Sequence, residues 1–386
     1  MLLASAIAGI LVIFSVLLDA FETVVLPRRV QRQFRISALF YRKTWVPWRR
    51  ICSRIKSVSR RENFLGYFGP LSLIVLLGLW AVGLIFGFAL LQFGAGEHLQ
   101  LNREPITFTR LIYQSGETFF TLGYGDIVPI SGIARALAVL EAGMGFGFLG
   151  TVIGYLPTIY SSFSRREIEI SLLDARAGSP PTAAELLARF GNPPQQEVLD
   201  QIFRSWERWA AEVLESHLSY PALSFFRSQH NNQSWLGALT TILDASALVI
   251  SGVDGLRSDQ AKITFAIARH AVVDLAQVVY ASYDPNIPDR LPAPEFVRLQ
   301  QSLAERGINL NLGSEREQKL TQLRALYEPY AQGMARNLLI NLPPWIHPER
   351  KRDNWQVGPW DRAIQARSLA GLMSTQQQRH RADEHF

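Results

Sequence analysis

Apolar stretches without any charged side chain dominate the first part of the chain. Three such stretches occur, at residues 1–18, 63–96 and 142–164. A helix needs about 20 apolar residues to cross the hydrocarbon core of a bilayer. We therefore predict three membrane-spanning helices, at residues 1–26, 65–91 and 133–160. This pattern excludes an ordinary soluble protein.

The rest of the chain has a different pattern, in which apolar residues recur at helical spacing. Five amphipathic helices are predicted from it, at residues 195–217, 234–250, 258–283, 294–306 and 314–339. Thr182 followed by Glu185 is typical of a further helix start. We expect a helical domain at 164–373 and a polar tail at 374–386. The predicted fold class is an all-α membrane protein.

Basic residues are concentrated beside the apolar stretches. Residues 27–65 hold 12 lysines and arginines and one acid, whereas residues 161–386 hold 24 basic and 25 acidic residues. Basic loops stay on the cytoplasmic side of a membrane and are attracted to anionic lipid headgroups. We therefore expect an outside N-terminus, a cytoplasmic or interfacial segment at 27–64, a cytoplasmic C-terminus and contacts with membrane lipids. The local origin of the basic charge argues against a nucleic-acid partner.

Two acids stand at the inner end of the first predicted span. Asp19 and Glu22 have two interpretations: functional acids inside the membrane, or interfacial partners of Arg28 or Arg29. Residues 34–61 mix aromatic and basic side chains, as in a helix lying on the membrane surface or a simple anchor. Cys52 is the one cysteine, which excludes a disulfide framework and a cysteine-based metal site.

The segment between the second and third predicted spans is too short to cross the membrane. Residues 107–120 predict a helix of roughly 20 Å, so it is re-entrant or interfacial. The next six residues, Thr121-Leu-Gly-Tyr-Gly-Asp126, cannot continue a helix because two glycines flank the tyrosine. Extended backbone at membrane depth is tolerated only where protein buries it or where it lines an aqueous path.

This six-residue sequence, the short helix before it and the two flanking spans resemble the potassium channel superfamily, of the prokaryotic type with two spans and a pore loop. The resemblance covers about residues 65–160. It implies a pore-loop domain at 65–163 in a homotetramer of the bacterial plasma (inner) membrane. The implied parts are an outer helix at 65–91, a pore helix at 107–120, a filter at 121–126 and an inner helix at 133–160. The first span and the helical cytoplasmic domain are additions to this type.

The resemblance assigns roles to the filter residues. Backbone carbonyls replace the water shell of a permeant potassium ion where four chains converge. The ion-coordinating residues would be Thr121, Leu122, Gly123, Tyr124 and Gly125. The two glycines permit the left-handed backbone that turns successive carbonyls the same way. Leu122 stands where the family usually has valine or isoleucine, which leaves a weakly selective cation channel as an alternative. Potassium is the permeant ion, and no cofactor is expected.

Three residues around the filter match supporting positions of the family. Glu117 corresponds to a carboxyl that bonds behind the filter to Asp126, and Tyr113 corresponds to an aromatic donor to the same aspartate. We expect these three residues to control filter rigidity and inactivation. The alternative is that Glu117 forms a salt bridge with Arg110 or Arg135.

The third predicted span is rich in glycine. Residues 145–150 satisfy the pattern G-x-G-x-x-G, but no strand precedes them, so we reject a dinucleotide site. Gly145 matches the hinge of the family's inner helix. The pairs Gly143/Gly147 and Gly150/Gly154 each stand four residues apart, as in closely packed helices. Helical phase points four residues to the cavity: Phe146, Leu149, Ile153 and Pro157. Glu141 either faces the pore or lies behind the pore helix against Arg135.

The cytoplasmic part carries neither a Rossmann-type nor a β-roll pattern. His270 and Asp274 stand one helical turn apart, which fits either a metal or proton site or a satisfied polar pair. No catalytic set stands out, so we do not expect an enzyme. No helix has an arginine at every third position, so no voltage sensor is predicted. The domain either assists tetramer assembly or responds to a cytoplasmic ligand. A membrane-anchored scaffold with a vestigial pore is the alternative from another functional class.

Overall fold

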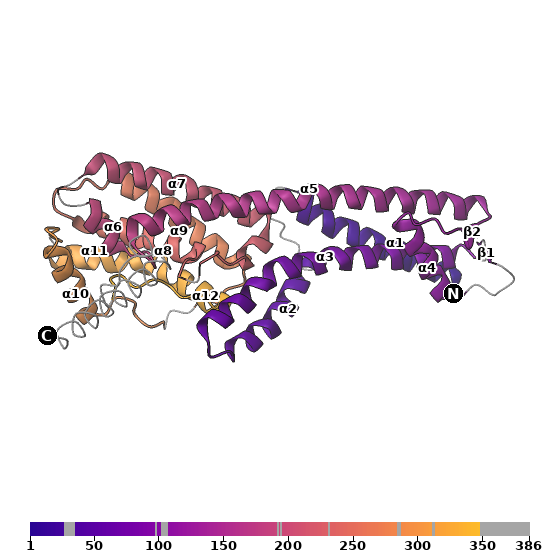
Figure 1. The fold of residues 1–386 in the computed structure, drawn as a ribbon, viewed down its shortest axis with the longest axis horizontal. Helices are drawn as coiled ribbons and strands as arrows, with labels where there is room; N and C mark the ends of the chain where they lie inside the picture. The colour runs from indigo at the N-terminus through magenta and orange to yellow at the C-terminus, as the bar shows by residue number, and fades with distance from the viewer. Residues whose placement is uncertain are drawn as a thin grey trace, which may run out of the picture.

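The computed structural model describes residues 1–26, 35–96, 99–101, 107–190, 193, 195–230, 232–283, 287–310 and 313–347. The predicted tail at 374–386, the end of the predicted helical domain and Arg28 and Arg29 lie outside these residues. The described part is elongated (Figure 1). The N-terminus, a short helix and a small ribbon lie at one end, a helical domain lies at the other, and one long helix runs along both.

The first half of the chain forms five α-helices and a ribbon: α1 (Leu2–Ala20), α2 (Ile36–Ser53), α3 (Val58–Gly94), β1 (Leu99–Leu101), α4 (Phe108–Phe119), β2 (Ile127–Pro129) and α5 (Gly132–Ala177). A π-helical turn, η1 (Phe21–Val25), extends α1. The two strands pair antiparallel, and this is the one sheet in the described residues. The predicted all-α class is therefore confirmed.

Helices α1 and α3 pack closely through small residues. A Cβ built on Gly9 would lie 2.7 Å from the carbonyl oxygen of Gly87, and one built on Gly94 would lie 2.6 Å from the backbone nitrogen of Ala6. The Ser5 hydroxyl also donates to the Leu90 carbonyl at 2.9 Å. Small residues let helices approach closely inside a membrane. This contact therefore attaches the additional N-terminal helix to the pore domain.

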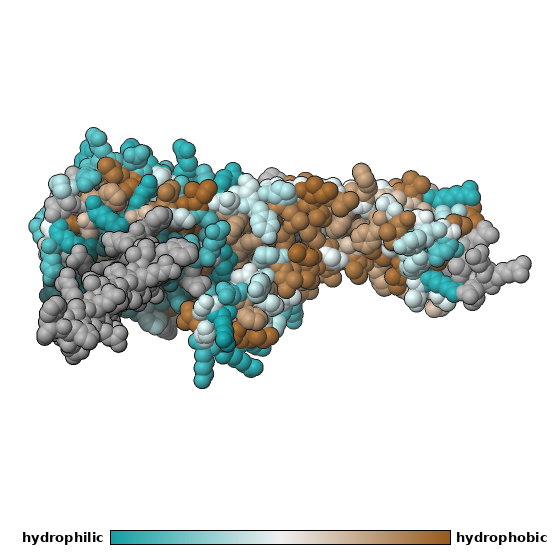
Figure 2. Space-filling model, in the orientation of Figure 1, coloured by the Kyte–Doolittle hydropathy of each residue, from teal (hydrophilic) through white to brown (hydrophobic). Residues whose placement is uncertain are grey.

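An apolar belt crosses the face of the molecule shown in Figure 2, over the part formed by these helices. Phe14 on α1, Ile74 and Val82 on α3 and Val139 on α5 each expose more than half of their surface. Polar surfaces flank the belt on both sides. A belt of this kind matches the hydrocarbon core of a bilayer.

The second half of the chain forms seven α-helices and a 3-10 turn: α6 (Ala183–Phe190), α7 (Gln196–Ser219), η2 (Pro221–Phe225), α8 (Trp235–Gly252), α9 (Asp259–Val278), α10 (Ala293–Ala304), α11 (Ser314–Ala325) and α12 (Glu328–Leu338). The predicted start after Thr182 is present, because the Thr182 hydroxyl accepts from the Glu185 amide at 3.2 Å. The helix predicted at 314–339 is divided in two. Pro329, in the first turn of α12, lacks the amide proton that a continuous helix needs.

Helix α8 is apolar on all sides and lies at the centre of this domain. It is one of four described helices that are long and apolar enough to cross a membrane, beside α1 with η1, α3 and α5. Each of its residues from Trp235 to Ser251 is buried. A helix that is hydrophobic all round is normally enclosed by other structure. The neighbouring helices α9, α11 and α6 provide that enclosure.

Helix α5 joins the two halves without interruption. It has 46 residues and is about 69 Å long at 1.5 Å per residue. The predicted inner helix ended at 160, and the predicted domain boundary between 163 and 164 lies inside α5. Beyond that point Ile170 and Leu173 are fully buried in the helical domain. The inner helix and the helical domain are thus one continuous piece of backbone.

Candidate functional site

Backbone hydrogen bonds of helical type connect the start of the segment Thr121–Asp126 to the end of α4. The Phe120 amide donates to the Gly116 carbonyl at 3.0 Å, and the Leu122 amide donates to the Glu117 carbonyl at 2.9 Å. These bonds satisfy carbonyls that a helix end would otherwise leave free. The start of the predicted filter is therefore fixed by the short helix before it.

The backbone of this segment alternates, with the first, third and fifth residues in the left-handed region. The φ angles are +54° at Thr121, +69° at Gly123 and +78° at Gly125. Glycine adopts this conformation without penalty, so its two positions follow the sequence prediction. A β-branched residue such as Thr121 adopts it rarely, and such strained residues cluster at functional sites. Nothing in the sequence indicated the conformation of Thr121.

The filter segment is open on one side in a single chain. All six residues from Thr121 to Asp126 are exposed, and the apolar side chains of Leu122 and Tyr124 are 55% and 70% exposed. Large exposed apolar patches mark surfaces that contact other molecules. This side of the segment is therefore free within one chain to contact other groups.

Glu117 holds the filter backbone from behind. Its buried carboxylate accepts a hydrogen bond from the Gly125 amide at 3.1 Å, in place of the expected bond to Asp126. The alternative partner Arg135 instead donates from Nε to the Pro129 carbonyl at 3.2 Å. A carboxylate that accepts from a backbone amide forms a comparatively strong hydrogen bond. Glu117 is thus placed to stabilise the left-handed turn at Gly125.

Asp126 anchors the outer end of the filter. Its carboxylate accepts from the amide of Ile127 at 3.1 Å and also interacts with the Tyr113 hydroxyl. Ile127 begins β2, which pairs with β1 in the register Leu101 to Ile127. The three predicted supporting residues, Tyr113, Glu117 and Asp126, therefore lie together beside the filter.

The predicted cavity-lining residues lie on one uncovered face of α5. Phe146, Leu149 and Ile153 are 74%, 53% and 64% exposed, and Pro157 is exposed too. Only 11% of the most apolar part of α5 is buried, compared with 56% for α3. The face of α5 that the sequence assigned to a cavity is thus the face that a single chain leaves without a neighbour.

Gly145 is the point where α5 touches the pore helix. A Cβ built there would lie 1.9 Å from the carbonyl oxygen of Phe119. The helix continues through Gly145 without a break. For Gly143, Gly147, Gly150 and Gly154, nothing within the chain lies within 4 Å of a built Cβ. The assigned hinge is therefore a close contact in this conformation, and the other four glycines face open space.

Glu141 lies behind the pore helix rather than facing the path. It is fully buried, and its carboxyl contacts the hydroxyl of Ser115 on α4. The same hydroxyl lies 2.7 Å from the Ile85 carbonyl on α3. Of the two sequence interpretations, the structure matches the position behind the pore helix, with Ser115 in place of Arg135 as partner.

Asp19 joins three helices at the C-terminal end of α1. Its carboxylate is fully buried and accepts from the Ser37 amide at 3.0 Å, from the Ser37 hydroxyl at 3.0 Å and from Nε1 of Trp80 at 2.9 Å. Nearby, Arg35 lies 3.5 Å from Glu22. The two acids therefore bind the start of α2, which makes their role structural in this conformation.

A buried arginine connects the C-terminal part of α5 to the rest of the helical domain. Arg166 donates to the carbonyls of Leu223 at 3.0 Å and Phe226 at 2.9 Å, forms an ion pair with Glu167 at 3.0 Å and lies 3.1 Å from Nε2 of His217. Sequence analysis missed this role. The signal available in the sequence was the helical spacing of Ile159, Arg166, Ile170 and Leu173, which puts Arg166 on an otherwise apolar stripe.

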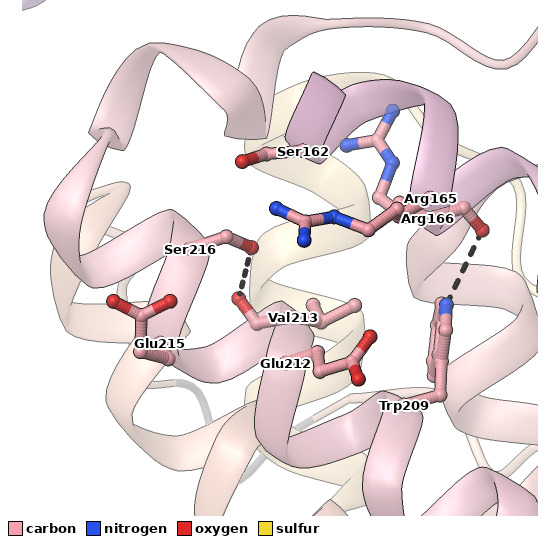
Figure 3. A pocket seen from close by; sticks show the side chains of 8 residues that line it. All are labelled: Ser162, Arg165, Arg166, Trp209, Glu212, Val213, Glu215 and Ser216. Carbon is pink, nitrogen blue, oxygen red and sulfur yellow. Dashed lines mark hydrogen bonds between the residues drawn. The ribbon is translucent and has the colours of Figure 1, made fainter. Parts of the chain in front are cut away.

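A small pocket of about 150 Å³ opens beside Arg166, between α5 and α7 (Figure 3). It is lined by Ser162, Arg165, Arg166, Trp209, Glu212, Val213, Glu215 and Ser216. Arginine and glutamate side chains share its walls, so it presents no single charge to a ligand. Its significance is its position at the junction of the inner helix with the domain.

The chain from Leu223 to Phe226 continues this junction toward the membrane-facing helices. Phe225 stacks on Tyr41 of α2 with ring centroids 5.4 Å apart, and it packs against Phe68 of α3 at 5.3 Å. Arg166 therefore reaches α2 and α3 through one short turn. A displacement of the helical domain would therefore move both α5 and α2.

The predicted metal or proton site is absent from the described residues as a ligand cluster. No group of three histidine, cysteine, aspartate or glutamate side chains in this part of the chain could hold a metal ion. His270 and Asp274 lie 3.7 Å apart as an isolated pair. This arrangement matches the satisfied polar pair.

Comparison with known proteins places the pore at the centre of the similarity. The family described as ion channel matches residues 74–161, which are 88 of the 386 residues. The inward rectifier potassium channel Kirbac3.1 of Paramagnetospirillum magnetotacticum is 33% identical over 96 residues, covering 25% of this chain and 31% of that protein. The uncharacterized membrane protein YdjJ of Bacillus subtilis is 22% identical over 238 residues, covering 61% and 68%. No solved structure matches the chain.

The re-entrant helix, the left-handed loop after it and the two long helices around them define an ion channel domain of the pore-loop class. The matched family covers this unit from α3 to α5. Residues 74–161 thus form an ion channel domain that is similar in sequence to a potassium channel, and the chain carries an N-terminal helix and a helical domain on either side of it.

Proposed function

We propose that this protein is a potassium-selective channel in which four copies of the chain surround one path. The observation that carries the proposal is the filter segment, whose alternating left-handed residues stand exposed at the edge of a single chain. Backbone carbonyls arranged in rings replace the hydration shell of potassium. Thr121, Leu122, Gly123, Tyr124 and Gly125 would supply these carbonyls, while Tyr113, Glu117 and Asp126 support them.

The uncovered inner helix supports assembly from several chains. Phe146, Leu149 and Ile153 would line the cavity below the filter, with Pro157 near its inner mouth. A ring of large apolar side chains closes a pore by excluding water. Gly145 is the proposed bending point of α5, and the other glycines of α5 would face neighbouring subunits. The protein would work by passive conduction and not as an enzyme.

We place the channel in the plasma membrane, with the N-terminus outside and the helical domain in the cytoplasm. The apolar belt over α1, α3 and α5 supports the membrane position. Basic side chains at the described end of α2, among them Arg49, Arg50 and Arg54, support a cytoplasmic position for this end by the positive-inside rule. Anionic lipids are proposed partners of the same side chains.

The helical domain is proposed to control the gate mechanically. Because α5 is continuous from the filter to Ala177, a rotation of the domain moves the cavity-lining face without an intervening linker. A cytoplasmic ligand or a second set of domain contacts would shift the equilibrium between the open and closed states.

Ion flux into liposomes tests the proposal. Purified protein is reconstituted with potassium inside and sodium outside, with and without barium. We expect barium-blocked potassium flux at least tenfold faster than sodium flux, which corresponds to about 1.4 kcal/mol of discrimination. A Gly123→Ala variant is the control, because a side chain there is strained at φ +69°. Flux that Gly123→Ala leaves unchanged would contradict the proposal.

A weakly selective cation channel is the second candidate, and Leu122 is the observation that favours it. Its side chain is 55% exposed at the filter, where the family usually carries valine or isoleucine, which are β-branched. The same liposomes decide between the candidates, because comparable sodium and potassium flux indicates weak selectivity. Leu122→Val would then raise the preference for potassium.

A further inference from the structure

Glu141 occupies a place where a charged carboxylate is costly. It lies in the apolar part of α5 with no exposed surface, and its hydrogen-bond partner in the described part of the chain is the Ser115 hydroxyl. Its second oxygen, Oε2, is buried without a partner. No ion pair joins it to a cation among the described residues. Burying a carboxylate without a cation or several donors is strongly unfavourable.

The hydrogen-bond count at Ser115 indicates where a proton must be. Ser115 has one hydroxyl proton and lies against two oxygen atoms, the Ile85 carbonyl at 2.7 Å and Oε1 of Glu141. The Ile85 carbonyl and an ionised Glu141 could both only accept, so a single Ser115 proton would leave one of the two contacts without a hydrogen. Both contacts become hydrogen bonds if the Ser115 proton goes to Ile85 and Glu141 supplies the second proton, which it donates to Oγ of Ser115.

We infer that Glu141 is a protonated carboxylic acid at neutral pH and that it positions the pore helix behind the filter. The donor chain runs from Glu141 on α5 to Ser115 on α4 and on to the Ile85 carbonyl on α3. Glu117, two residues after Ser115, holds the Gly125 amide. Fixing α4 between its two neighbours therefore fixes the carboxylate that holds the filter. This positioning role rests on the proposed channel function, whereas the protonation does not.

No charged group near Glu141 among the described residues is directed at its carboxyl group. Ser115 on α4 and the Ile85 carbonyl on α3 are neutral. The ionisable residues nearest along α4, Tyr113 and Glu117, are directed to Asp126 and Gly125 at the filter. On α5, Arg135 donates to a backbone carbonyl of the pore loop. Deprotonation would therefore turn the Ser115 proton toward the Glu141 carboxylate and remove the hydrogen bond to Ile85 on α3, which would loosen α4.

Infrared spectroscopy of the purified full-length protein tests the protonation directly. At neutral pH we expect a carboxylic-acid C=O stretching band that is absent from Glu141→Gln. In the wild type this band should disappear at alkaline pH. Identical spectra for wild type and Glu141→Gln in the carboxylic-acid region would overturn the inference. This measurement does not depend on whether the protein conducts.

Potassium flux from liposomes tests the positioning role. Glutamine keeps a donor for Ser115 but cannot ionise, so Glu141→Gln should stay within about twofold of wild type and be independent of pH. Wild-type flux should fall about tenfold as pH rises to alkaline values, and Glu141→Ala should be slow at every pH. A Gln variant as slow as the Ala variant, or a wild-type profile as flat as that of Glu141→Gln, would overturn the role.

If the wild type gives no flux, the proposed function fails, and hydrogen–deuterium exchange decides the positioning role in its place. The amides of α4 should then exchange faster in Glu141→Ala than in Glu141→Gln. Equal exchange in the two variants would overturn it.

Discussion

Gly145 of α5 and Phe119 at the end of α4 are in such close contact that a Cβ on the glycine would lie 1.9 Å from the Phe119 carbonyl oxygen. The pore helix and the inner helix can therefore approach each other only where α5 has no side chain. The resemblance to channel inner helices suggested a hinge at Gly145, and the contact suggests a packing role. Both roles require glycine at this position, and the substitution Gly145→Ala distinguishes between them.

Gly145→Ala should destabilise the pore domain, because the methyl group collides with backbone that cannot move aside cheaply. Overpacking of this kind costs about 1–3 kcal/mol or more. Thermal unfolding in detergent measures the effect, and Gly78→Ala in α3 is the control, since nothing lies within 4 Å of a Cβ there. If Gly145→Ala unfolds like wild type but alters open probability, the hinge role is the correct one.

Glu117→Ala should shorten openings of the channel, because it removes the acceptor of the Gly125 amide. Losing a hydrogen bond to a charged group costs about 1.5–3 kcal/mol, which would shift the balance toward non-conducting filter states. Single-channel recording in planar bilayers measures the open lifetime. Glu117→Gln keeps an acceptor oxygen and should show a smaller effect. Open lifetimes equal in all three proteins would show that Glu117 does not stabilise the filter.

Much of the pore domain could be predicted because membrane-spanning helices and a left-handed loop leave direct marks in a sequence. The spans at α1, α3 and α5 follow from the length of uncharged segments. The two filter glycines follow from the need for positive φ. Thr121 was not predictable, because its left-handed backbone depends on the loop being held at both ends, by α4 and by Asp126.

The length of α5 was the main difference between prediction and structure. A helix that leaves an apolar environment changes only its pattern of side chains, and Pro157, which stands just before the predicted end at 160, lies inside α5 without ending it. Its true end has a clear mark in Gly178, which follows the last helical residue with φ of +86°. The partners of Asp19 and Arg166 were also hidden, since each binds groups 18 or more residues away in the sequence.

Stability of the helical domain should decrease as pH falls from about 7 to about 5. Nδ1 of His217 lies 2.8 Å from the Val213 carbonyl, so Nδ1 carries the proton and Nε2 accepts from Arg166. Burial and the charge of Arg166 hold the pKa of His217 well below its ordinary value. The folded protein keeps His217 neutral, whereas the unfolded imidazole takes up a proton below about pH 6.5.

The unfolded state therefore binds more protons in this range, and His217 lowers the unfolding free energy by up to about 1.4 kcal/mol per pH unit. Thermal midpoints at the two pH values measure this loss. His217→Gln should reduce it, because glutamine offers both a donor and an acceptor without titrating. His270→Gln is the control at an exposed position. Equal pH dependence in wild type and His217→Gln would exclude His217 as the source.

Arg290→Met should destabilise the helical domain strongly. The guanidinium lies 2.7 Å from Asp244 of α8 and 3.1 Å from Glu328 of α12, and it donates to the Pro343 carbonyl at 2.8 Å. Removing it leaves two buried carboxylates without this cation, which costs about 3–5 kcal/mol. Chemical unfolding measures the loss. Arg298→Met, which breaks an exposed pair with Glu295, should cost less than about 1 kcal/mol.

Asp19→Ala should release the start of α2 from the pore domain. The substitution leaves the Ser37 amide and Nε1 of Trp80 without their acceptor in a fully buried place, at a cost of about 1–3 kcal/mol for each group. Hydrogen–deuterium exchange should then accelerate in the first turn of α2 and stay unchanged in α8, which is distant from Asp19. Ser37→Ala removes one side-chain donor but keeps the amide bond, so its effect should be small. Unchanged exchange in α2 of Asp19→Ala would mean that the aromatic contacts of Tyr41 and Trp45 hold this helix without the carboxylate.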